Sequence, residues 1–445
     1  MPKYAIQSGF RYAALALLAL ATVSIAQESP ADALLENYER ALSSGLYDEA
    51  AVAAKSRLEQ AIQDGRIKEM SSVGLLSDLA LVQRLTGEFN SALQNYETAI
   101  DIVETKRDML DIALTEPLLG IGKTYIDSGR PDLALQHLDR ALHVRSVNAG
   151  PHSIEQAETL EVLADAYQTM GKPGKAADVA DRLYLVYSRK YPGNSVQLVP
   201  ILLKKGHILG EIGDWRRSRN AYVEALDIVE KADGDSSVNS IRPLIGMGNS
   251  HAKEYFELFF LAETEDDLPN GKLLVQAETY FESAMELTEN AAAEDWRLVQ
   301  DAMLALGDFF TMTNERSRAR VVYRSAWDLL STDDAKLLQR KINLEHIVPL
   351  LQPNPDLTVA LPFDEQEDAA SPQYQTGFIV SQFTVTRRGD LATIGLVEIV
   401  PERNEKIEAE VKSALTRFVY RPRFERGTAV DTAGQLIRFE FPYPE

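Results

Sequence analysis

Six histidines are the side chains of this sequence best suited to acid–base or metal chemistry near neutral pH. They do not cluster: His137 and His143 lie six residues apart, a spacing that puts them on different faces of a helix. No metal-protease, phosphate-loop, dinucleotide-binding or hydrolase motif accompanies them. We therefore expect a protein that is not an enzyme and that has no cofactor and no metal site. The remaining histidines are His152, His207, His251 and His346.

Composition excludes several further classes of site and partner. The 445 residues contain no cysteine, which excludes disulfides, thiolate metal sites, a cysteine nucleophile and a lipoprotein anchor. A formal charge of −21 repels phosphate backbones, so we expect no nucleic-acid partner. Hydrophobic residues make up 45% of the chain, enough for a folded protein, and the length suggests two or three domains.

The N-terminus has the organisation of a secretory signal. Lys3 and Arg11 precede an apolar run, and Ser24-Ile25-Ala26 ends it with small residues. The apolar stretch is about 14 residues long, whereas a membrane-spanning helix needs about 20. We predict a signal peptide over residues 1–26 and a periplasmic protein. The alternative is a retained inner-membrane anchor facing the periplasm, and only then would the chain associate with a membrane.

A repeat with a period of 42 residues governs the next part of the chain. Five glycines follow this spacing, each between two amphipathic segments: Gly45, Gly87, Gly129, Gly171 and Gly213. Small residues recur seven positions before most of them and five positions after each, as the close approach of two helices requires. The register resumes after an extra loop of about 17 residues around 263–271. The pattern predicts seven helical hairpins over residues 27–348.

These hairpins resemble the tetratricopeptide repeat, whose usual period is about 34 residues. The eight additional residues of each unit are expected between its second helix and the first helix of the next unit. The resemblance implies an all-α helical solenoid whose first helices line a concave face that binds a protein segment. It places six polar residues on that face: Lys123, Glu161, Asp165, His207, Asn249 and Asp308. A partner of mixed or basic charge would suit the acidic surface. The alternative is that these six residues line the groove and contact only solvent.

The pattern changes after the repeats. Prolines and acidic residues concentrate in 349–372, which predicts an extended linker. Residues 373–445 then predict a small α+β domain of order β-β-α-β. Its strands are expected at 378–386, 391–400 and 434–441, with a turn at 387–390 and a helix at 404–418.

A second resemblance lies in the C-terminal domain. Phe418-Val419-Tyr420-Arg421-Pro422, followed by Gly427, resembles the signature of the TonB C-terminal domain. In that family the domain binds a short segment of an outer-membrane receptor along its exposed sheet edge, by strand addition. The resemblance assigns the edge to the last strand: Gln435, Leu436, Ile437, Arg438, Phe439, Glu440 and Phe441. A nearby basic cluster could meet an acidic partner or the chain's own acidic array: Arg417, Arg421, Arg423 and Arg426.

Two functions are compatible with these features. The first is an exported interaction protein, a TonB-type adaptor or transducer variant in envelope transport whose repeats recruit a protein partner. The second is a periplasmic scaffold for envelope assembly with no role in energy transduction.

Overall fold

The computed structural model describes residues 30–353, 355, 357, 374–400 and 405–444. The predicted signal peptide and most of the predicted linker lie outside the described residues. The chain divides into two compact units, residues 1–170 and 171–445, and each is described by itself. Neither unit contains, within its described part, a helix long and apolar enough to cross a membrane.

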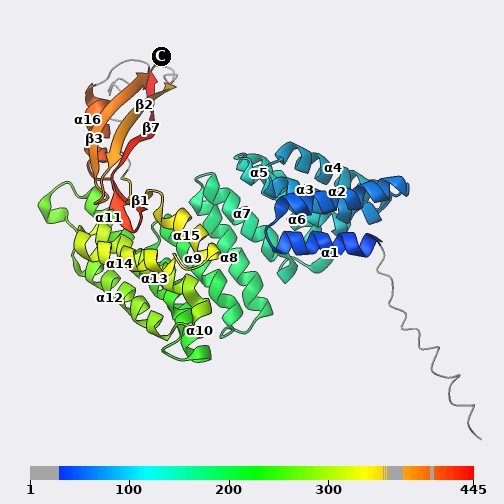
Figure 1. The fold of residues 1–445 in the computed structure, drawn as a ribbon, viewed down its shortest axis with the longest axis horizontal. Helices are drawn as coiled ribbons and strands as arrows, with labels where there is room; N and C mark the ends of the chain where they lie inside the picture. The colour runs from blue at the N-terminus through cyan, green and yellow to red at the C-terminus, as the bar shows by residue number, and fades with distance from the viewer. Residues whose placement is uncertain (1–29, 354, 356, 358–373, 401–404, 445) are drawn as a thin grey trace, which may run out of the picture. The chain divides into compact units, whose positions relative to one another are not determined.

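The described part of the first unit is all-helical (Figure 1). Each helix packs against the next one in the chain, and α3 also contacts α5, which contacts α7. This is the contact pattern of a solenoid. The helices are α1 (Pro30–Ser43), α2 (Tyr47–Gln63), α3 (Ser71–Leu85), α4 (Phe89–Lys106), α5 (Thr115–Asp127), α6 (Pro131–Ala149) and α7 (Ala157–Thr169).

The second unit continues the same alternation and then changes to strands (Figure 1). Successive helices again pack together from α8 to α14, and α11 contacts both α9 and α13. The helices are α8 (Pro173–Lys190), α9 (Val199–Glu211), α10 (Trp215–Asp233), α11 (Ile241–Leu261), α12 (Lys272–Leu287), α13 (Trp296–Met312), α14 (Arg316–Leu329) and α15 (Asp334–Leu344).

In chain order, α1 to α14 supply a first and a second helix for each of the seven units that the 42-residue period predicts. The five spaced glycines all occupy the turn within a pair, with φ between 64° and 83°. Only glycine adopts this left-handed conformation freely. The seventh turn uses Asn314 instead, with φ 67°, and asparagine is the residue next best suited to it. The register of the seventh unit is thus preserved without a glycine.

Large side chains of the second helices pack against small residues of the first helices. A Cβ atom on Gly206 would lie 2.7 Å from the Tyr222 ring, and one on Gly246, in the next unit, 2.3 Å from the same ring. Tyr222 is thus enclosed between glycines of successive units. Gly248 opposite Phe281 and Gly307 opposite Tyr323 repeat this arrangement. The predicted packing role of these glycines is confirmed.

The eight additional residues of each unit, expected between its second helix and the next first helix, are divided between a longer second helix and the connection that follows it. Second helices α4, α6, α8 and α10 are 18 or 19 residues long, whereas first helices α5, α7 and α9 have 13. A short 3-10 turn then leads into each following first helix, as at 112–114 and 154–156. The added length is a longer second helix and a structured connection.

The insertion in the sixth unit is not only a loop. Helix α11 has 21 residues, eight more than α9, so part of the inserted sequence extends the helix. The added turns carry an aromatic series in which Tyr255 stacks on Phe259, with centroids 6.1 Å apart. Residues 262–271 form the connection, with a 3-10 turn at Glu265–Asp267 capped by Thr264. The expectation of a purely looped insertion is wrong, because its first part continues the helical apolar pattern.

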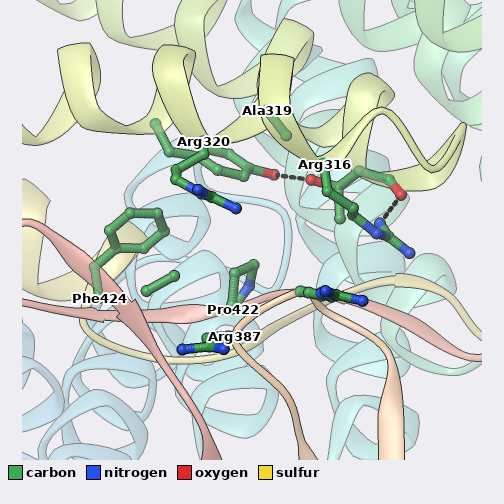
Figure 2. Close-up of a pocket in the computed structure, with 10 residues that line it drawn as sticks. Arg316, Ala319, Arg320, Arg387, Pro422 and Phe424 are labelled. Carbon is green, nitrogen blue, oxygen red and sulfur yellow. Dashed lines mark hydrogen bonds between the residues drawn. The ribbon is translucent and has the colours of Figure 1, made fainter.

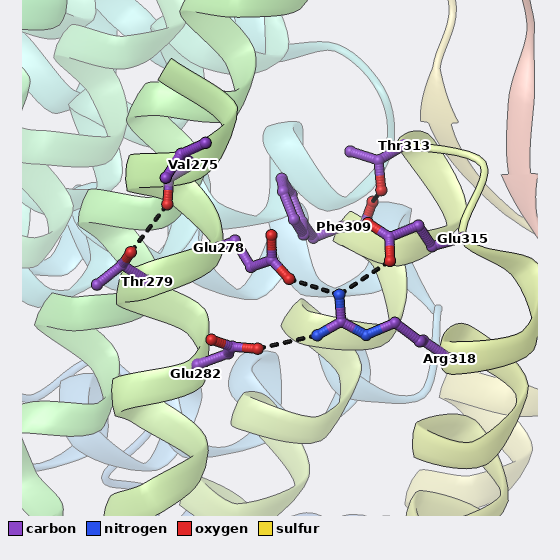
Figure 3. Close-up of polar contacts among 8 residues, drawn as sticks. All are labelled: Val275, Glu278, Thr279, Glu282, Phe309, Thr313, Glu315 and Arg318. Carbon is purple, nitrogen blue, oxygen red and sulfur yellow. Dashed lines mark hydrogen bonds and ion pairs between the residues drawn. The ribbon is translucent and has the colours of Figure 1, made fainter. Parts of the chain in front are cut away.

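Ion pairs join equivalent second helices of neighbouring units. In Figure 3, Arg318 of α14 extends toward Glu278 and Glu282 of α12, at 2.5 and 2.9 Å. Arg217 of α10 pairs with Asp181 of α8 at 2.6 Å. These two residues are 36 positions apart in the sequence, as are Arg318 and Glu282. Hydrogen bonds from Arg318 to Glu315, the residue that precedes α14, and to Glu278 raise the pKa of this arginine. Charged side chains on second helices are therefore paired between neighbouring repeats.

One buried histidine makes a pH dependence expected. His251 of α11 is 6% exposed, and its Nδ1 donates to the carbonyl of Met247 at 2.8 Å. Burial lowers the pKa of His251, and the charge of Arg219 lowers it further, whereas the hydrogen bond to Met247 and the charge of Glu254 oppose the shift. The Tyr280 ring packs against the imidazole, with ring centroids 5.4 Å apart. The neutral form stabilises the fold above the unfolded pKa of about 6.5, and this contribution is lost as the pH falls.

We therefore expect His251→Gln to reduce the loss of stability between about pH 7.5 and pH 5. Urea unfolding at both pH values measures the difference. His152→Gln is the control, since His152 is exposed. An unchanged difference in His251→Gln would contradict the assignment.

The C-terminal domain contains the predicted β-β-α-β order together with three additional short strands. A three-stranded antiparallel sheet has the order β3-β2-β7, formed by β2 (Tyr374–Val385), β3 (Leu391–Val400) and β7 (Thr432–Pro444). Helix α16 (Glu405–Leu415) covers one face through Ile407, Val411 and Leu415. The short strands are β4 (Val419–Arg421), β5 (Arg423–Glu425) and β6 (Thr428–Val430).

The start of the predicted linker is a strand. β1 (Val348–Leu351) pairs antiparallel with β4, with Val348 opposite Arg421. Pro349 is tolerated because β1 pairs on one side alone among the described strands, so its missing N–H costs no ladder bond. The chain therefore enters the C-terminal domain's packing before residue 353, and the linker expectation is corrected at this end.

Candidate protein-binding surfaces

The polar residues predicted to line the repeat face lie on first helices. In the first unit, Lys123 of α5 pairs with Glu158 of α7 at 2.8 Å, which joins two consecutive first helices. Glu161, half-buried, and Asp165, exposed, follow on α7, and both have interaction partners. This face of the first unit is therefore charged and cross-linked by side-chain contacts.

In the second unit, His207 on α9 and Asn249 on α11 are exposed. The pKa of His207 is lowered by desolvation among the surrounding helices and by the positive charge of Lys253. Lys253 of α11 in turn pairs with Glu211 of α9 at 2.6 Å. A basic and an acidic group thus lie beside the two predicted residues.

Asp308 has a different environment from the other five. Its two carboxylate oxygens accept from Nε and Nη2 of Arg421 at 2.7 and 2.6 Å, and one also accepts from the Tyr323 hydroxyl at 2.7 Å. Arg421 donates further to the carbonyl of Asn343 at 2.8 Å. The side chains of Arg421 and Asp308 are 8% and 18% exposed. Asp308 is therefore already occupied by the C-terminal domain.

The electrostatics of this junction favour the charged guanidinium of Arg421. Burial alone would lower the pKa of Arg421, but the adjacent Asp308 carboxylate outweighs it, and the pKa stands above its ordinary value. Burial and the same carboxylate raise the pKa of Tyr323. A planar guanidinium that makes two parallel bonds to a carboxylate fixes both distance and orientation. The pair therefore fixes β4 against the last repeat.

Apolar and further polar contacts complete this junction. Phe424 of β5 is 1% exposed and packs in the cluster of the last repeats, with its ring 5.6 Å from Tyr323 and 6.4 Å from Trp327. Arg324 of α14 donates to the carbonyl of Gly427 at 3.0 Å, and Arg316 pairs with Asp390. The C-terminal domain is thus packed on the last repeat, and of the four arginines in the predicted basic cluster, Arg421 meets the repeats through Asp308.

The predicted edge strand lies at the edge of its sheet. Among the described strands β7 pairs only with β2, from Thr432 opposite Val385 to Pro444 opposite Tyr374. Its side chains alternate: three face the core with α16 (Ile437, Phe439 and Phe441), three are exposed on the opposite face (Leu436, Arg438 and Glu440), and Gln435 is half-buried. Leu436 is 62% exposed, and Arg438 lies over the Phe378 ring at 3.9 Å.

Two prolines show which backbone groups of β7 point outward. Pro442 and Pro444 lie within the strand, opposite Thr376 and Tyr374. Both occupy even-numbered positions of β7, two residues apart. A proline is accepted in a sheet only where no ladder N–H is needed. Successive residues of an antiparallel strand direct their N–H groups to opposite sides. The even-numbered residues 436, 438 and 440 therefore direct their N–H groups away from β2.

Sequence reasoning missed a cluster of arginines beside the junction. Arg320 of α14 and the turn residues Arg387 and Arg388 line a cleft of about 670 Å³, and Arg316 lies in an adjoining cavity. Figure 2 shows Arg316 and Arg320 on the helix and Arg387 across from them, with Pro422 and Phe424 between. The four-residue spacing of Arg316, Arg320 and Arg324 was a usable signal, since it places them on one helical face.

The described residues contain no group of histidine and carboxylate side chains placed to hold a metal ion.

Comparison with known proteins agrees with the repeat assignment. The tetratricopeptide repeat family model matches residues 114–186. No curated protein matches the chain. Tetratricopeptide arrays present a continuous surface to other proteins, so this part of the chain is a protein-interaction scaffold.

Solved structures with similar helical arrays share little sequence with the chain. The C-terminal part of a TPR repeat-containing protein from Cytophaga hutchinsonii is 10% identical, with 68% of this chain and 97% of that chain covered and a TM-score of 0.41. The apo form of RapI is 12% identical, with 69% and 99% covered and a TM-score of 0.42. PilF of Pseudomonas aeruginosa is 17% identical, with 61% and 95% covered and a TM-score of 0.37.

Proposed function

We propose that this chain is an exported, non-enzymatic adaptor that binds an extended segment of an outer-membrane receptor along β7, while its repeats recruit a second protein. The observation that carries the proposal is the unpaired edge of β7. Among the described strands it has β2 on one side only, and its outward backbone groups are regularly spaced. An incoming strand would gain hydrogen bonds from these groups, and the alternating side chains would select it.

The sequence-level resemblance to the TonB C-terminal domain supports the same binding mode. Phe418 and Tyr420, which carry the resemblance, are 2% and 5% exposed and belong to the core under the sheet. Gly427, with φ 75°, makes the predicted turn together with Arg426, whose φ is 48°. Two successive residues in this conformation form the type I′ turn that suits a two-residue hairpin.

The second candidate is a periplasmic scaffold for envelope assembly. It is favoured by the buried junction at Asp308, Arg421 and Phe424, because an energy transducer that must reach across the periplasm needs a freely extending domain. Here the domain is attached to the last repeat. The adaptor and the scaffold make different predictions for a variant that changes only the free edge.

Arg438→Pro is the test of strand addition. It removes one outward N–H group from β7, and we expect the sheet to remain folded, with a free energy of unfolding within about 1 kcal/mol of Arg438→Ala. Ile437→Pro removes an inward N–H group and is expected to cost about 3 kcal/mol or more. Purified full-length variants would be used to capture proteins from a solubilised envelope fraction, with identification by mass spectrometry.

The adaptor function predicts that wild type and Arg438→Ala recover outer-membrane receptors and that Arg438→Pro does not. Recovery of the same receptors by all three would exclude strand addition at this edge. Recovery of assembly proteins alone by all three would favour the scaffold. Removal of the whole domain is a poorer test, because Phe424 and Arg421 complete the packing of the last repeat.

The export part of the proposal is tested by the intact mass of the protein from fractionated cells. A mature chain that begins at Gln27 in the soluble periplasmic fraction would support the adaptor. A full-length chain in the inner membrane would favour a transducer that retains residues 1–26 as its anchor.

A further inference from the structure

The arginine-lined cleft beside the junction has no role in the function proposed above. Its wall on α14 is formed by Arg320, Val321, Arg324 and Ser325. The facing wall is formed by Arg387 and Arg388, from the turn between β2 and β3, and by the β5–β6 hairpin at Gly427, Thr428 and Ala429. The described lining residues include no acidic side chain. Positive charge is thus concentrated at one place on a chain whose formal charge is −21.

The cations of the cleft differ in whether they are already paired. Arg316 donates to Asp390 and to the carbonyl of Thr311, and Arg324 donates to Asp328 and to the carbonyl of Gly427. The guanidinium groups of Arg320, Arg387 and Arg388 have no protein partner among the described residues. These three charges are available to a ligand.

The backbone of the turn is nevertheless fixed. The N–H of Arg387 donates to Asp431 at 2.6 Å, and the N–H of Arg388 donates to the Thr386 hydroxyl at 3.2 Å. Gly389, with φ 91°, completes the turn, and its N–H donates to the carbonyl of Thr386. Two unpaired guanidinium groups therefore project from a rigid support, which lowers the entropy cost of using them for binding.

The geometry points to a binding site for an acidic segment of a protein partner, held between Arg320 on one wall and Arg387 and Arg388 on the other. Guanidinium groups bind carboxylates by paired hydrogen bonds. The cleft volume of about 670 Å³ exceeds what a single small anion would fill and is open enough to admit several residues. Cations on both walls suit a chain that lies between them.

The site also depends on the docked arrangement of the domain. One wall belongs to the last repeat and the other to the C-terminal domain, and Arg421 and Phe424 hold the two together. A ligand that contacts both walls binds the docked state alone, and it therefore stabilises that state by mass action. The site is separate from the edge of β7.

A fluorescent hexaglutamate peptide is the probe, with binding to the full-length chain measured by anisotropy at low salt. We expect Arg387→Gln combined with Arg388→Gln to weaken binding at least about fivefold, and Arg320→Gln to weaken it independently. The matched control is Arg189→Gln combined with Arg216→Gln, two exposed arginines outside the cleft. It carries the same change of charge and should alter the dissociation constant less than about twofold.

Absence of peptide binding, or equal weakening in the cleft and control variants, would overturn the assignment. So would displacement of the peptide by inorganic phosphate at matched ionic strength, which would identify a small-anion site. Neutralising the acidic residues at 364–368 should leave the affinity unchanged, and tighter peptide binding would show instead that this segment of the chain competes for the cleft. Arg438→Pro should leave peptide binding unchanged, which separates this result from the test of β7.

Discussion

Asp308→Ala is expected to lower the free energy of unfolding by about 3–5 kcal/mol, because it leaves the buried guanidinium of Arg421 without its carboxylate. The substitution also removes one of the two hydrogen-bond partners of the Tyr323 hydroxyl, the other being Thr311. Urea unfolding followed by tryptophan fluorescence measures the loss, since Trp296 lies on α13 and Trp327 on α14. The effect should appear in the transition of the last repeat.

Asp301→Ala is the matched control on the same helix. Asp301 pairs with Arg242 at 3.0 Å, but that pair is far more exposed than Arg421 and Asp308, and its removal should cost about 0–1 kcal/mol. Asp308→Leu combined with Arg421→Met should recover most of the loss, because an apolar pair leaves no buried charge unpaired. If Asp308→Ala cost no more than Asp301→Ala, the pair would not hold the domain in place.

Phe424→Ala is expected to cost about 3–5 kcal/mol, the range for removing a fully buried phenylalanine ring. The ring contacts Tyr323 and Trp327, so the cavity opens between the C-terminal domain and the last repeat. We expect a lower unfolding midpoint and a change in tryptophan emission, because Trp327 gains access to water. Both are read from the same urea titration.

Phe378→Ala provides the control for Phe424→Ala, since it removes the same atoms elsewhere in the domain. Phe378 is half-buried on the open face of the sheet and is expected to cost about 1 kcal/mol. Equal losses in the two variants would mean that Phe424 stabilises the domain alone and contributes nothing to the junction. Phe424→Leu should recover part of the stability, because it refills much of the cavity.

The repeat architecture could be predicted because it is encoded locally and many times over. Gly45 and its four successors mark the first five turns by a backbone conformation that only glycine adopts freely, and the period resumes after the insertion in the sixth unit. Gly307 lies seven positions before the turn at Asn314, the same offset at which small residues precede most of the earlier turns. The strands at 374–385 and 391–400 were predictable for a similar reason, since alternation and turn residues are local signals.

The junction could not be predicted, because its contacts join residues far apart in the chain. Arg421 and Asp308 are separated by 113 residues, and either charge alone has the appearance of a solvated surface group. Asp308 was therefore assigned to an open ligand face. The same limit applies to β1, whose pairing with β4 spans about 70 residues, and to the arginine cleft, which forms only when its two walls meet.

The edge of β7 is an intermediate case. Its position at the end of the sheet was expected from a resemblance, and the topology of the described strands agrees with that position. Pro442 and Pro444 also indicate which N–H groups of β7 point away from β2. This could be interpreted only from the structure, because the strand had first to be shown to extend through both prolines.

A stack of repeats has an apolar surface exposed at each end, and in the second unit Phe424 and Arg421 cover that surface on α13 and α14. The C-terminal domain is thus the capping element of the solenoid. Because internal units contact only their neighbours, duplication or loss of a repeat between them would leave this cap undisturbed. The seventh unit cannot be exchanged in the same way, since its sequence must match the cap. The array can therefore change its length in evolution only upstream of the unit that the cap recognises.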